Sequence, residues 1–156
     1  MGYILEAVVG PENVLRKVML DIPAAAVVPL GQGIAMVPMT DKLFAAVTDG
    51  ASDRPLGFWK LPGGFDRVLA EWSCDGPVGY VEAEYFGGFG GQRAALWVDG
   101  EVSLGPLTAD AGTPPVEGAS PISQVLRQLG VKRDDKHDEF EVIGLGRHGH
   151  TSEWTS

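Results

Sequence analysis

The dipeptide Asp99-Gly100 is the feature that most restricts the fold of this chain. It separates two β-prone runs, residues 93–98 and 101–106, and an Asp-Gly connection of two residues is typical of a type I′ hairpin turn. Residues 78–85, rich in Val and Tyr, provide a strand before this hairpin. The sequence therefore predicts a three-stranded antiparallel meander.

The same turn fixes which residues face one another across the hairpin. We expect three cross-strand pairs: Val98 with Glu101, Trp97 with Val102, and Ala95 with Leu104. The last two pairs share one face, which we expect to be the core face. Apolar residues of the second strand also point to the opposite face, so we expect that face to be partly covered.

Three segments have the apolar spacing of amphipathic helices. The first follows Thr40 as N-cap, and the second spans residues 65–72. The third begins at Ser120-Pro121 and ends at Gly130 in the left-handed cap position. Residues 3–9 and 34–37 are predicted to be further strands.

The length of 156 residues suits one domain that buries its core without metal or disulfide, and a single cysteine, Cys74, excludes an intrachain disulfide. We expect an α+β fold with a mainly antiparallel sheet of about four to five strands and two or three helices on one face. The whole chain, 1–156, is predicted to be one globular domain. Within it we expect a mobile loop at 107–119 and a loosely held C-terminal tail.

The charge balance restricts the partners. Twelve Lys and Arg residues stand against 21 Asp and Glu, a net charge of −9, and no basic cluster could displace counterions from phosphates. Nucleic acid and anionic membranes are therefore excluded as expected partners. The N-terminus has no basic region before an apolar run, so we expect a cytoplasmic protein. A basic protein partner, or self-association, fits the acidic surface.

Two carboxylates, Glu82 and Glu84, alternate with Tyr80 on one face of the predicted strand 78–85. Carboxylates two residues apart in a strand are suitable for acid–base chemistry or for binding a cation or partner. The alternative is a solvated strand face, on which Arg93 pairs with these carboxylates across the hairpin.

A glycine-rich run, GGFGGQ at 87–92, follows that strand. Because the next segment is a predicted strand rather than a helix, and no phosphate-binding motif is present, we do not expect nucleotide binding. We expect a wide hairpin loop. Phe89 either folds back onto the sheet or projects from the loop as a partner contact.

The C-terminal run Arg147-His148-Gly149-His150 carries the second candidate site. His148 and His150 have a spacing that chelates zinc or nickel when a third ligand is supplied, for which His137 or a strand glutamate is available. The alternative is that the histidines are solvated. Arg147 is a candidate binding residue, or it packs back with Trp154 to anchor the tail.

Four segments of the C-terminal half carry a resemblance. They are VEAEYFGG (81–88), QRAALW (92–97), SPISQVL (120–126) and GLGRH (144–148). In this order they resemble a family of small bacterial proteins with no assigned activity. The resemblance implies no reaction, substrate or functional residue. In size and charge, the chain is also similar to immunity proteins that neutralise a toxin.

No catalytic motif or cofactor-binding pattern stands out, so no cofactor is expected and the catalytic residues, if any, are unknown. We therefore expect a non-catalytic protein that acts through protein–protein contact and is immunity-like. Its candidate binding residues are Glu82, Glu84, Phe89, Arg93 and Arg147. The alternative is a metal-binding protein or metal-assisted hydrolase that uses His148, His150 and a strand glutamate.

Overall fold

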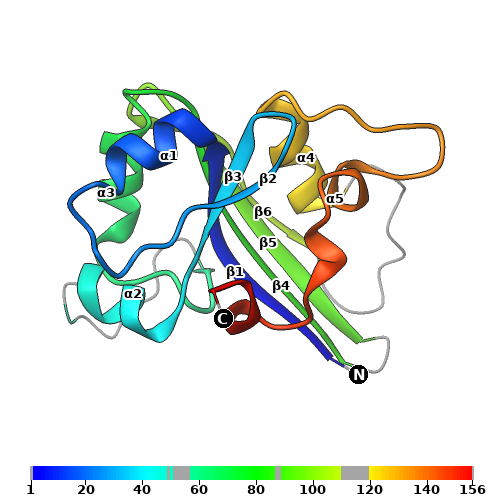
Figure 1. Ribbon diagram of the computed structural model, residues 1–156, viewed down its shortest axis with the longest axis horizontal. Helices are drawn as coiled ribbons and strands as arrows, with labels where there is room; N and C mark the ends of the chain where they lie inside the picture. The colour runs from blue at the N-terminus through cyan, green and yellow to red at the C-terminus, as the bar shows by residue number, and fades with distance from the viewer. Residues whose placement is uncertain (1, 49, 51–56, 87–88, 110–119, 156) are drawn as a thin grey trace.

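One antiparallel sheet runs through the middle of the molecule in the computed structural model, which describes residues 2–48, 50, 57–86, 89–109 and 120–155 (Figure 1). Its six strands lie in the order β2-β3-β1-β4-β5-β6. Their bounds are β1 Gly2–Pro11, β2 Val28–Gly31, β3 Ile34–Pro38, β4 Val78–Phe86, β5 Phe89–Val98 and β6 Glu101–Ala109. The predicted α+β class and antiparallel sheet are confirmed.

Helices cover both faces of the sheet (Figure 1). On the first face lie α1 (Glu12–Val18), α2 (Asp41–Val47) and α3 (Phe65–Trp72), and we call it the α1–α3 face. The second, the α4–α5 face, is covered by α4 (Pro121–Gln128), α5 (Glu139–Val142) and the short helices η2 (Leu145–Arg147) and η3 (Thr151–Thr155). In the described part of the chain, three helices therefore lie on one face, as expected, but α4, α5, η2 and η3 also cover the other, and the sheet has six strands instead of the expected four to five.

The predicted turn forms, and the meander follows it with two corrections, of which the first is that Val102, expected on the core face, is 41% exposed. Asp99 and Gly100 have positive φ angles of 52° and 88°, and the first two expected pairs are present. However, the pairing shifts between Leu96 and Trp97, so Leu104 faces Leu96 instead of Ala95. Because a shift of one residue reverses the face of a side chain, Leu104 packs toward the α4–α5 face.

Residues 89–92 of the glycine-rich run belong to a strand and not to the wide loop that we expected. β5 begins at Phe89, so Gly90 and Gly91 pair with β4, and residues 87–88 lie outside the described part of the chain. A Cβ on Gly90 would collide with the carbonyl of Glu84. Glycine therefore permits a close approach of the two strands here.

The C-terminal segment is attached to β1, which differs from the loosely held tail that we expected. β3 pairs only with residues from Ala7 onward, so it leaves the preceding edge of β1 open. The N–H of Ile4 donates to the carbonyl of Gly149 at 2.9 Å, and Trp154 is 8% exposed. The tail thus satisfies backbone groups that β3 does not reach. Of the expected loop 107–119, residues 107–109 belong to β6 and the others lie outside the described residues.

The close packing of α4 on β4 gives a first prediction. A Cβ on Gly79 would lie 2.7 Å from Cγ1 of Val125 and 3.0 Å from Cγ2 of Val9. Gly79→Ala should therefore lower the free energy of unfolding by about 1–3 kcal/mol, measured by urea denaturation. Gly146→Ala, which adds a methyl group with no atom within 4 Å, is the matched control and should change it by about 0.5 kcal/mol or less. Equal effects of the two substitutions would contradict this packing.

Candidate functional site

A row of charged side chains crosses the α1–α3 face on three neighbouring strands. Glu6 of β1 is the cross-strand partner of Glu82 in β4, which in turn faces Arg93 of β5. The next row along the same face, which includes Val8 and Tyr80, is fully buried, and it is apolar apart from the tyrosine hydroxyl. The polar end of this face is therefore a candidate site within an otherwise hydrophobic layer.

Glu82 is fully buried, so the expected solvated strand face is wrong for this residue. Its two carboxylate oxygens accept the backbone N–H groups of Trp59 and Lys60, each at 2.6 Å. The hydroxyl of Tyr80 lies 3.2 Å from Oε2 of the same carboxylate. Three hydrogen bonds thus compensate for the loss of water around a charge in the core.

Burial raises the pKa of the Glu82 carboxyl from its ordinary value of 4.5 to about 7. The N–H donors of Trp59 and Lys60 and the Tyr80 hydroxyl act in the opposite direction, because they stabilise the charged form, and the nearby Glu6 raises the pKa further. Loss of hydration is the largest effect. Glu82 therefore titrates close to neutral pH.

Glu82 holds residues 57–61, which cross the sheet. We call this segment the strap. Phe58 and Leu61 are buried, and the Phe58 ring packs edge-on against Tyr80 at 5.1 Å between ring centroids. The Tyr80 hydroxyl also lies 3.2 Å from the carbonyl oxygen of Lys60, so its single proton is shared between this carbonyl and the Glu82 carboxylate. Side chains and backbone together fix this segment, yet Trp59 between its anchors remains 39% exposed.

Trp59 lies against Arg93 of the neighbouring strand. The guanidinium carbon is 4.6 Å from the centroid of the indole ring, a cation–π geometry. Within the described residues, Arg93 forms no ion pair with either strand glutamate, and its buried Nε has no hydrogen-bond partner. Arg93 therefore supports Trp59 and does not neutralise Glu82 or the half-buried Glu84.

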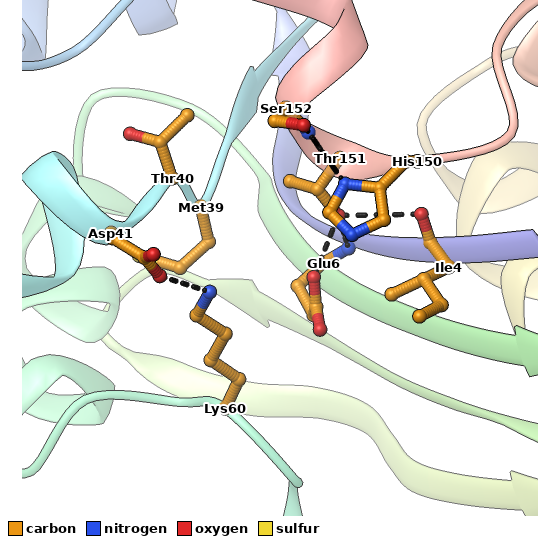
Figure 2. A pocket seen from close by; sticks show the side chains of 9 residues that line it. All are labelled: Ile4, Glu6, Met39, Thr40, Asp41, Lys60, His150, Thr151 and Ser152. Carbon is orange, nitrogen blue, oxygen red and sulfur yellow. Dashed lines mark hydrogen bonds and ion pairs between the residues drawn. The ribbon is translucent and has the colours of Figure 1, made fainter.

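A pocket of about 180 Å³ lies on the other side of the strap, where β3 has ended and the C-terminal segment meets β1. Figure 2 shows Lys60 and Asp41 on one side of it and Glu6 with the C-terminal residues on the other. Its lining residues are Ile4, Glu6, Met39, Thr40, Asp41, Lys60, His150, Thr151 and Ser152.

Hydrogen bonds fix the polar groups of this pocket. The Thr151 hydroxyl accepts the N–H of Glu6 at 3.1 Å and lies 2.6 Å from its carboxylate, to which it donates. Opposite, the Lys60 ammonium is 2.9 Å from Asp41 and holds the pKa of that exposed carboxyl below its ordinary value. Hydrogen bonds therefore hold Glu6 on one side of the pocket, and a solvent-exposed ion pair directs Lys60 toward Asp41 on the other.

The structure separates the residues of the expected C-terminal site. His150 lines the pocket, whereas His148 packs edge-on against Trp154 at 4.6 Å between ring centroids. Arg147 donates to the carbonyl of Gly144 and stacks on Trp154, so it anchors the tail. The side chain of Phe89 lies outside the described residues. In the described ranges, no three His, Cys, Asp or Glu side chains are grouped so that they could hold a metal ion.

Sequence reasoning missed four contributors: Glu6, Asp41, Trp59 and Lys60. The segment that carries Trp59 and Lys60 reads as a polar loop, although Phe58 and Leu61 within it are apolar. The glutamates inside the apolar runs of β1 and β4 were the available signal, because a carboxylate in a buried strand needs polar partners.

Comparisons with known proteins found no relative of this chain: no family model, no curated protein and no solved structure matches it. Among the described residues, no helix is both long enough and apolar enough to cross a membrane.

The raised pKa of Glu82 gives a second prediction. The folded state binds this proton more tightly than the unfolded state, so the resulting stabilisation is complete below pH 4.5 and is lost as the pH rises through about 7. Relative to Glu82→Gln, the free energy of unfolding of the native protein should fall by up to about 3 kcal/mol between pH 5 and pH 8. Urea denaturation at several pH values measures this difference.

The exposed Glu101 of β6 provides the control, since Glu101→Gln removes a carboxylate that stays in water. The free energy of unfolding of Glu101→Gln should change with pH in the same way as that of the native protein over this range. If the Glu82→Gln curve were also parallel to that of the native protein, Glu82 would not be the titrating buried group.

Proposed function

We propose that this chain is a non-catalytic, cytoplasmic, immunity-like protein that acts by binding a protein partner, with Trp59 at the centre of the contact. One observation carries the proposal: Trp59 is exposed, while its backbone N–H is bonded to a buried carboxylate. A large aromatic side chain is thus presented to solvent from a segment that is fixed to the core.

Rigid presentation of an aromatic residue favours binding for a physical reason. When two proteins associate, each group that becomes immobilised loses conformational entropy. A group that is already held in place before binding loses less. Tryptophan and arginine are also the residues most enriched among those that dominate binding energies. Trp59 supported by Arg93 combines both features at one place.

The negative net charge of the chain favours a basic protein as the partner. The net charge of −9 attracts a basic protein and accelerates its encounter with this surface. Glu84 lies on the same face of the sheet as Arg93, is half-buried, and makes none of the hydrogen bonds or ion pairs found within the described residues. A cationic side chain of the partner can therefore pair with it beside Trp59.

A variant pair tests the proposal. Trp59→Ala removes the exposed ring and leaves the backbone bonds to Glu82, whereas Leu20→Ala removes another exposed apolar side chain, which is 79% exposed. In affinity purification from the native lysate, the native protein and Leu20→Ala should retain one specific partner. Trp59→Ala should weaken that interaction about tenfold or more, as measured on the purified pair.

Self-association is tested with the same variants by sedimentation equilibrium. A dimer that Trp59→Ala dissociates, and Leu20→Ala does not, would identify a second copy of the chain as the partner. The proposal is wrong if no specific partner or dimer is found, or if both substitutions leave the affinity unchanged.

A further inference from the structure

The pocket beside the strap contains a carboxylate that no cation neutralises within the described residues. Glu6 is half-buried, and among the described residues its side chain is bonded only to the Thr151 hydroxyl. Lys60, the nearest ammonium in the lining, is paired with Asp41 on the opposite side. A half-buried carboxylate without a counter-ion is an unfavourable arrangement that a bound cation would relieve.

The other ionisable group of the lining, the imidazole of His150, makes its hydrogen bonds with a neighbouring residue of the C-terminal segment. The Nδ1 atom of His150 lies 3.2 Å from the backbone nitrogen of Ser152 and 2.9 Å from the hydroxyl oxygen of the same residue, so this ring nitrogen is engaged with Ser152 and not with Glu6. Glu6 and Asp41 contribute two negative charges and Lys60 one positive charge. The carboxylates of the lining thus outnumber its ammonium group by one, and the buried Glu82 lies beside Glu6 on the next strand.

We propose that this pocket binds a primary ammonium group, with the Glu6 carboxylate as its counter-ion. This inference is independent of the Trp59 contact, because the pocket lies on the other side of the strap and uses different side chains. The pocket has a volume of about 180 Å³, and a water molecule in the liquid occupies about 30 Å³. The pocket therefore has room for several water molecules, which a short alkylammonium chain can displace.

The arrangement of acceptors favours ammonium over guanidinium. Carboxylates line the pocket on two sides: Asp41 at the start of α2 lies on one side and Glu6 of β1 on the other (Figure 2). Acceptor oxygens therefore approach the space from opposite sides. An ammonium group directs three donors in different directions, whereas a guanidinium presents its donors in a flat fork.

Titration followed by amide NMR spectroscopy tests this site with defined probes. n-Butylammonium represents a free amine, and Nα-acetyl-lysine N-methylamide represents a lysine side chain. Both should shift the amide signals of Glu6, Lys60 and Thr151, and the tighter of the two identifies the source of the ammonium group. n-Butanol and butyrate, of similar shape but neutral or negative, should produce no saturable shifts at these amides.

Two substitutions give opposite results if the proposal holds. Glu6→Gln keeps the shape but removes the counter-ion, and it should weaken n-butylammonium binding about tenfold or more. Lys60→Met removes a like charge and keeps the backbone bond to Glu82, so it should leave binding intact or strengthen it. Glu101→Gln on β6 is the control for loss of a carboxylate elsewhere and should have no effect.

The proposal would be overturned by three results. These are the absence of saturable shifts with either amine, equal binding of n-butanol, or tighter binding of butyrate that Lys60→Met abolishes. The last result would identify an anion site built on Lys60. A folded Glu6→Gln variant, verified by its amide spectrum, that binds the amine like the native protein would also contradict the assignment of Glu6.

Discussion

The buried carboxylate of Glu82 is the constraint on which the rest of this site depends. A charge without water in the middle of a sheet is tolerated only where donors surround it, and here two of them are the backbone N–H groups of Trp59 and Lys60. The strap is therefore tied to β4 at a fixed place. Its buried neighbours Phe58 and Leu61 add apolar contacts to the same attachment.

Two surface features follow from this attachment. Trp59 is directed outward over β5, where Arg93 supports its ring, and Lys60 is directed toward α2, where it pairs with Asp41. The pocket exists because Lys60 closes one side of the space that β3 leaves when it ends at Pro38. The C-terminal segment closes the other side through Thr151. The partner contact and the ammonium pocket that we propose thus lie on opposite sides of the strap.

Local signals predicted the elements well, and pairings between distant segments account for what was missed. The caps at Thr40 and Ser120 and the positive φ of Asp99 and Gly100 are properties of a few adjacent residues. The shift at Leu96 and the pairing of Glu6 with Glu82 depend instead on strands that meet only in the fold. The partners of Glu82 are backbone N–H groups, which every residue except proline carries, so side-chain identity gives no signal for them.

Hydrogen exchange at the Trp59 and Lys60 amides tests the central claim most directly. Because both N–H groups are bonded to a fully buried carboxylate, they should exchange as slowly as amides of the central strands, although Trp59 itself is exposed. In Glu82→Gln, one of the two acceptor oxygens is replaced by an amide nitrogen, and protection should fall at one or both positions while β4 stays protected. Fast exchange of both amides in the native protein would contradict the account.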